Sequence, residues 1–176
     1  MAVTTIMDDS VSSIDTTAWT RALDVAFKRV AQGTLCLDDA RVEPDAQLCA
    51  TTRVRGAYIS LLDGDTSVLL GMRGAKSDCQ TLTRYMMAME ADEVLQDDDV
   101  TGAIGEMMNI VAGVVKSEIG SSQLRLGIPM VVSGRVSPAS QQRVACRVVT
   151  LGDAQVEVLL HHRSRLRASS RIGRAS

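Results

Sequence analysis

The sequence has few aromatic residues. One Trp, one Phe and two Tyr make up only 2% of its 176 residues. Hydrophobic residues nevertheless account for 45% of the chain, so a folded core must be built mainly from Val, Leu, Ile, Met and Ala side chains. This hydrophobic content excludes a chain that is disordered throughout, and the length fits one domain with a substantial core.

Long apolar runs and clustered cysteines are also missing. No apolar run reaches the ~18 residues that a membrane-spanning helix needs. The N-terminal segment MAVTTIMDDS lacks the basic and then apolar pattern of a secretory signal. The two histidines are adjacent and the cysteines form no Cys-x-x-Cys pair, which is poor spacing for zinc. We therefore expect a cytoplasmic protein with reduced thiols at Cys36, Cys49, Cys79 and Cys146.

Charge is distributed unevenly along the chain. The net charge is −2, and residues 163–176 contribute five arginines and no acid, so the remainder carries −7. This acidic balance argues against nucleic acid as the main partner. We predict a flexible leader at residues 1–14, one folded domain at 15–162 and a basic disordered tail at 163–176.

Hydrophobic periodicity and turn signals predict an α/β domain in two layers. Helices are expected where apolar residues recur every three or four positions, and strands where residues alternate and β-branched side chains are frequent. The expected fold is one antiparallel sheet of about six strands with helices packed on it. The predicted helices cover about 16–32, 78–89 and 97–120, capped by Asp15 and Asp78 in the first two cases, and the predicted strands cover 34–42, 51–62, 67–72, 124–133, 143–151 and 155–161.

The segment from Asp97 to Gly120 is predicted to be an amphipathic helix with two distinct sides. Glu106 and Asn109 are three positions apart, so they are neighbours on the side that faces away from the core. Two glycines share that outer side, although a glycine inside a helix costs about 1 kcal/mol relative to alanine. This pattern indicates room for another molecule to approach. The outer glycines are Gly102 and Gly113, and the inner side is formed by Val100, Ile104, Met107, Val111, Val114 and Glu118.

A Glu-x-x-Asn pair by itself is most often the solvated side of a helix. It offers no nucleophile beside a base, no pair of carboxylates and only feeble metal ligands. It can, however, orient a water molecule and form a salt bridge, because an amide both donates and accepts hydrogen bonds. Phosphoryl hydrolysis uses a water-orienting side chain of this kind.

The residues around this pair resemble a known family. GAIGEMMNIVAG from Gly102 to Gly113, followed by RLGIP from Arg125 to Pro129, is similar to the CheX/CheC/FliY chemotaxis phosphatases, whose hallmark is a helical Glu-x-x-Asn. The single copy of the motif is closer to the CheX type than to the two-site CheC type. The resemblance in element order extends from about Asp15 to His162.

The resemblance implies hydrolysis of the aspartyl phosphate on a CheY-like response regulator. Asn109 would orient the attacking water and Glu106 would pair with a lysine of the partner, while Gly102, Gly105 and Gly113 would contact that partner. Mg²⁺ would belong to the partner, so the chain needs no cofactor or metal of its own. The family often dimerises, so a homodimer is also expected, without nucleic acid or membrane as partners.

Two other functions remain open from the sequence. The first is a non-enzymatic adaptor or scaffold that binds a response regulator or the flagellar switch. The second is a regulator with a small-molecule partner, for which no pocket signature is visible. The acidic stretch at 90–99 is interpreted as an ordinary solvated loop and helix cap, with steering of a basic partner as the alternative.

Overall fold

A computed structural model describes residues 15–44, 54–63, 66–134 and 142–164 of the chain. The predicted leader and nearly all of the predicted basic tail lie outside these residues and stay predictions, as does the environment of Cys49. The described residues form three helices and seven strands. In chain order they are α1 (Thr16–Gly33), β1 (Ala40–Pro44), β2 (Val54–Asp63), β3 (Thr66–Ala75), α2 (Lys76–Met87), α3 (Asp97–Ile119), β4 (Arg125–Leu126), β5 (Met130–Gly134), β6 (Gln142–Leu151) and β7 (Ala154–Ser164).

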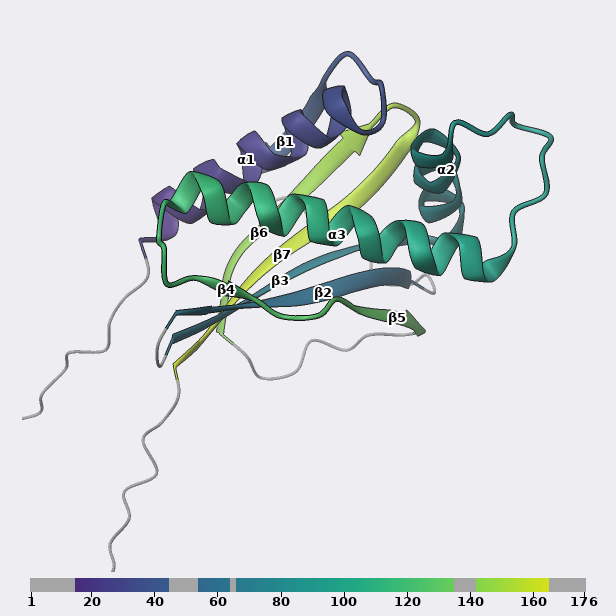
Figure 1. The fold of residues 1–176 in the computed structure, drawn as a ribbon. Coiled ribbons are helices and arrows are strands. Elements are labelled where there is room, and N and C mark those ends of the chain that lie inside the picture. The colour runs from purple at the N-terminus through teal and green to yellow at the C-terminus, as the bar shows by residue number, and fades with distance from the viewer. Residues whose placement is uncertain (1–14, 45–53, 64–65, 135–141, 165–176) are drawn as a thin grey trace, which may run out of the picture.

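The strands form one antiparallel sheet in the order β1-β6-β7-β3-β2-β4, and β5 also pairs with β2. Figure 1 shows the three helices on the same face of this sheet, with α3 crossing in front of the strands. The two-layer α/β fold with an antiparallel sheet that the sequence predicts is therefore confirmed. Strands β4 and β5 lie at one edge of the sheet and β1 at the other.

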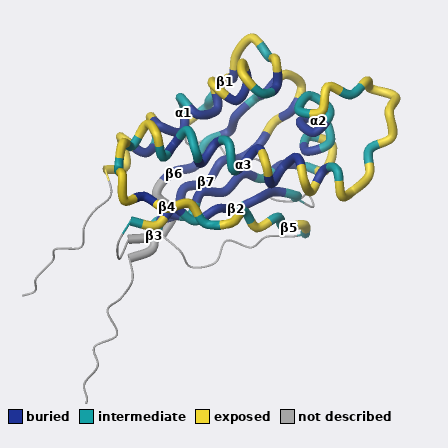
Figure 2. Tube along the Cα trace, viewed as in Figure 1, coloured by how far each residue is buried: buried dark blue, intermediate teal, exposed yellow. Residues whose placement is uncertain are grey.

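The core lies between the helices and the sheet, where Figure 2 shows the buried residues concentrated. Alternate residues of the central strands point toward the helices, as the period of two in a β-strand requires. The side chains are mostly aliphatic, in agreement with the composition, and Phe27 and Trp19 of α1 are the two large aromatic members among the described residues. The central strands contribute Ala57, Ile59, Leu61, Val68, Leu70, Met72, Val156, Val158 and Leu160.

Local structure differs from the sequence prediction at two places that bear on the site. The strand expected at 124–133 is divided into β4 and β5. The segment between β4 and β5 lies close to β2, because the Gly127 N–H donates to the Ser60 carbonyl at 2.7 Å. A Cβ at position 127 would lie 3.2 Å from that carbonyl oxygen, so glycine permits the close approach.

The second difference is the start of α2. The prediction that Asp78 is its N-cap is wrong, because the helix begins at Lys76 with Ala75 at the N-cap position. Asp78 lies inside the first turn, and its carboxylate accepts a hydrogen bond from the Ala75 N–H at 3.2 Å. The carboxylate thus accepts from the N–H of the N-cap residue itself, from the third helical position. Asp15 is the N-cap of α1, as predicted.

Candidate functional site

Helix α3 carries the candidate site, and its N-terminus is tied to two neighbouring elements. Asp97 forms ion pairs with Arg55 of β2, at 3.3 Å between Oδ2 and Nη2, and with Lys76 of α2, at 3.5 Å between Oδ1 and Nζ. Hydrogen bonding to Arg55, followed by the charges of Arg55 and Lys76, holds the pKa of the Asp97 carboxyl below its usual value. The N-terminus of the helix is thereby held against β2 and α2.

Capping interactions stabilise both ends of α3, and a second ion pair lies near its C-terminal end. The Asp99 carboxylate accepts from the Gln96 N–H at 2.9 Å, and acidic residues in the first turn favour the positive end of the helix dipole. Gly120 ends the helix in the left-handed conformation at φ 71°, which glycine adopts without a Cβ penalty. Near this end, Glu118 pairs with Arg29 of α1 at 2.8 Å.

The inner side of α3 is wider than the sequence analysis predicts. Val115 is fully buried where the predicted stripe has Val114, and Val114 is only half-buried. Glu118, expected on the inner side with these residues, is exposed and paired with Arg29. Because α3 packs on α1, α2 and the sheet together, more of its circumference is covered. The most deeply buried residues of the helix are Val100, Ile104, Met107, Met108, Val111, Ala112 and Val115.

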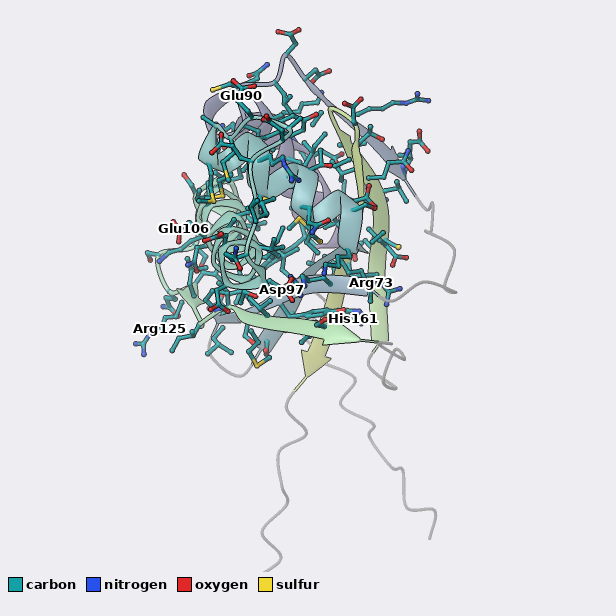
Figure 3. All side chains as sticks on the ribbon, turned by 90° about the vertical axis from the view of Figure 1, so that its right-hand side faces the viewer. Arg73, Glu90, Asp97, Glu106, Arg125 and His161 are labelled. Carbon is teal, nitrogen blue, oxygen red and sulfur yellow. The ribbon has the colours of Figure 1, made fainter. Side chains whose placement is uncertain are left out.

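Glu106 and Asn109 lie on the outer side of α3, as predicted from their spacing. Glu106 is exposed and Asn109 is half-buried, and the Asn109 Nδ2 donates to the Glu106 Oε2 at 3.3 Å. Figure 3 shows Glu106 at the surface, on the same side of the molecule as Arg125. An ionised carboxylate can only accept hydrogen bonds, so this contact turns the amide NH₂ toward Glu106 and leaves the amide oxygen available to a water molecule.

The three candidate glycines of α3 are not equivalent. A Cβ built at Gly102 or at Gly113 would have no atom within 4 Å apart from its own helix, so both positions face open space. Gly105 is buried, and a Cβ there would lie 3.4 Å from Val131 Cγ2 of β5. Its burial does not match the expected direct contact with a partner, and Gly105 instead lies where β5 passes under the helix.

Metal binding and membrane insertion have no candidate among the described residues. No group of three His, Cys, Asp or Glu side chains is arranged there to hold a metal ion. No helix in the same part of the chain has the length and the apolar character needed to cross a bilayer. The Glu106–Asn109 pair itself offers one carboxylate and one amide on the outer side of α3.

Sequence reasoning missed a second polar cluster, on the face of the sheet opposite the helices. Arg73 of β3 forms an ion pair with Glu157 of β7, whose side chain is only 1% exposed. The Cys146 Sγ–H donates to the other carboxylate oxygen of Glu157 at 3.3 Å. Tyr58 lies beside this cluster, and burial raises the pKa of its hydroxyl. Alternation along β7 suggests which face Glu157 occupies, but its pairing with a residue 84 positions away has no local signal.

Comparison with family models identifies one family. A family model described as chemotaxis phosphatase CheX matches residues 57–152, a range that includes Glu106 and Asn109. No curated protein matches the sequence.

Solved structures of the same fold include chemotaxis protein CheX from Vibrio vulnificus, with a TM-score of 0.65 and 14% identity over 86% of this chain and all of that one. The CheX–CheY–BeF₃–Mg²⁺ complex from Borrelia burgdorferi is similar at a TM-score of 0.65 and 14% identity, over 82% of this chain and 97% of that one. FliY from Thermotoga maritima is similar at a TM-score of 0.57 and 12% identity, over 78% of this chain and 83% of that one. At these identities the structural similarities establish a shared fold.

Proposed function

This chain belongs to the chemotaxis phosphatase CheX family, and we propose that it hydrolyses the aspartyl phosphate of a CheY-like receiver domain. The observation that carries the proposal is the exposed Glu106–Asn109 pair on α3, with open space at the two glycines beside it. The similar Borrelia structure contains CheX together with CheY, BeF₃ and Mg²⁺, which supports a receiver domain as the class of partner.

In the proposed reaction, a water molecule attacks the phosphorus of the receiver's aspartyl phosphate. The bond between phosphorus and the aspartate oxygen breaks, which returns a free carboxylate to the receiver and releases inorganic phosphate. Asn109 orients the water through its amide oxygen, since the NH₂ group is already directed to Glu106 at 3.3 Å. Positioning and electrostatics supply most of the catalysis in phosphoryl transfer, so one well-placed amide is a substantial contribution.

Glu106 has two tasks in this proposal. One carboxylate oxygen accepts from Asn109, and the carboxylate also pairs with the lysine that lies beside the receiver's phosphorylated aspartate. Mg²⁺ bound by the receiver supplies charge neutralisation at the phosphoryl oxygens. The chain itself lends two side chains from a helix that is fixed at both ends by the Asp97 and Glu118 ion pairs.

The test is to follow phosphate release from a phosphorylated CheY-type receiver with and without the protein. Asn109→Ala should lower kcat by about 100-fold, which is the usual cost of removing one positioned polar group at the reacting centre. Glu106→Ala should raise KM and also lower kcat, because it removes the salt bridge and the contact that orients the amide. Asp92→Ala is the matched control, since it removes one exposed carboxylate from the loop before α3.

Two results would contradict the proposed mechanism. If Asn109→Ala retains full acceleration, the amide does not orient the water. If the unmodified protein binds the phosphorylated receiver without accelerating phosphate release, the adaptor or scaffold function is correct instead. The predicted homodimer and the cytoplasmic location stay predictions, and sedimentation of the purified chain measures the first.

A further inference from the structure

The outer side of α3 carries one positively charged side chain. Lys116 lies in the last turn of the helix, whereas the acidic residues of the helix are Asp97, Asp98, Asp99, Glu106 and Glu118. Lys116 is half-buried and forms no ion pair with any residue that the structure describes. It is therefore a cation without a described partner on a helix whose other charges are carboxylates.

Lys116 lies on the same stripe of α3 as Asn109. The two residues are seven positions apart, and at about 100° per residue this brings them to within about 20° of each other around the helix. Their separation along the helix axis is about 10 Å. Gly113 lies between them, and a Cβ there would meet no atom within 4 Å outside its own helix. Asn109 and Lys116 are thus neighbours on one open surface.

The other end of this stripe carries the opposite charge. Asp98 is eleven positions before Asn109, which also places it within about 20° of Asn109 and about 16 Å away along the axis. Asp98 is exposed and has no ion pair within the part of the chain that the structure describes. Glu106 lies on the same side of Asn109 as Asp98. The stripe is therefore electrically asymmetric about Asn109, with carboxylates toward the N-terminus of α3 and an ammonium group toward its C-terminus.

A protein partner that contacts Asn109 also covers Lys116. A specific interface buries about 800 Å² per partner, which corresponds to a footprint about 32 Å across, so it extends about 16 Å from its centre. An ammonium group that is covered in this way loses water from its three N–H donors. Unless the partner supplies an acceptor, the loss of that water costs binding free energy.

We propose that Lys116 is a docking residue that pairs with a carboxylate of the phosphorylated receiver domain and fixes the orientation of the receiver along α3, an inference that rests on the proposed function. In this orientation the lysine of the receiver lies over Glu106 and a carboxylate of the receiver lies over Lys116. The reversed orientation brings like charges together at both places, which disfavours it. Because two turns of helix separate Lys116 from Asn109, its contact contributes to binding and not to the chemical step.

Lys116 also has a role that needs no partner. A cation in the last turn of a helix stabilises the negative end of the helix dipole. This role acts on the stability of the free protein and leaves the affinity for a receiver unchanged. Stability and receiver affinity must therefore be measured on the same variants.

The test compares Lys116→Gln, Lys116→Glu and Lys116→Arg. The control is Arg41→Gln, which removes one cation with a side chain 79% exposed on β1, at the sheet edge opposite β4. The probe for Kd is a CheY-type receiver loaded with Mg²⁺ and beryllofluoride, and the probe for KM and kcat is the phosphorylated receiver. The midpoint of thermal unfolding is recorded for each variant.

The effects should follow the charge at position 116. Lys116→Gln should raise Kd and KM by about fivefold, and Lys116→Glu by more than about tenfold, because reversal adds repulsion to the lost ion pair. Lys116→Arg and Arg41→Gln should stay within about twofold, and kcat at saturating receiver should stay within about twofold in all four variants. Raising the salt concentration from about 0.05 M to about 0.5 M should shrink the effect of Lys116→Glu several-fold.

The outcomes separate this inference from the proposed function. If the unmodified protein accelerates phosphate release and Lys116→Glu keeps its Kd and KM, the inference is wrong although the phosphatase function stands. This conclusion also holds if the thermal midpoint falls, because Lys116 then serves the helix end alone. If the protein does not accelerate release but Lys116→Glu weakens binding of the beryllofluoride-loaded receiver in a salt-dependent way, the docking role stands and the catalytic function fails. If Lys116→Gln lowers kcat and leaves KM unchanged, Lys116 acts on the phosphoryl group and its assignment to a carboxylate is wrong.

Discussion

Replacing the two outer glycines of α3 with alanine should make the protein more stable and less active. Gly102 and Gly113 are inside the helix, and a Cβ at either position would meet no atom within 4 Å outside that helix. Alanine there gains the helix propensity that glycine lacks, about 1 kcal/mol per site, without any steric cost in the isolated protein. If these positions provide clearance for a receiver, each added methyl group meets the partner instead.

The size of the stability gain follows from the positions of the two residues. They are separated by eleven residues, or about 16 Å along a helix, so their effects should add. Gly102→Ala/Gly113→Ala should therefore raise the free energy of unfolding by about 2 kcal/mol, and the midpoint of thermal unfolding by roughly 4–8 °C for a chain of this size. Urea unfolding followed by circular dichroism measures the first quantity.

The loss of activity should be measured on the same variants. An extra methyl group in a close-packed contact costs about 1–3 kcal/mol, so kcat/KM for phosphate release should fall by roughly tenfold for each site. Gly105→Ala is the matched control from the same helix. Its Cβ would contact Val131 inside the protein at 3.4 Å, so it should leave kcat/KM within twofold.

The gain of stability and the loss of activity can be refuted separately. If Gly102→Ala and Gly113→Ala gain stability but keep full kcat/KM, these glycines do not provide clearance for the receiver. If neither variant gains stability, the open space at these positions does not translate into helix stabilisation. If Gly105→Ala loses as much activity as the outer pair, the loss reports a distortion of α3 rather than contact with the partner.

Two further predictions concern buried groups outside the site. Arg73→Met leaves the Glu157 carboxylate, which is only 1% exposed, without its ion-pair partner. The free energy of unfolding measured by urea titration should therefore fall by about 3–5 kcal/mol, and a loss below about 1 kcal/mol would contradict this. Burial raises the pKa of the Cys79 thiol to about 11, whereas the thiol of the unfolded chain ionises near pH 9. The free energy of unfolding should therefore fall by up to about 2–3 kcal/mol as the pH rises from 9 to 11. The difference between the unmodified protein and Cys79→Ala across pH 8–11 measures this loss, and a difference that does not change with pH would refute it.

Local sequence pattern predicts much of the fold and the centre of the site. Helical spacing alone makes Glu106 and Asn109 neighbours, and Gly120 is the natural end of α3, because both depend on residues within one or two turns. Alternating strands and tight turns likewise predict the hairpins β2–β3 and β6–β7 and the two-layer class. The proposed phosphatase activity comes from the family resemblance, because the pair of side chains by itself permits several roles.

Tertiary structure decides which surface each of these residues occupies. Gly105 shares its helix with Gly102 and Gly113, yet it is buried because β5 brings Val131 against it. The Asp97 ion pair with Arg55 joins residues 42 positions apart, so no local pattern reports it.

The exposure of Ile128 arises in the same way, because it depends on β4 and β5 being the last strands of the sheet. The sequence by itself determined which residues are neighbours along one helix or one hairpin, since those distances are set by backbone geometry. Only the tertiary structure decided which of them are covered, since coverage depends on elements that are distant in the chain.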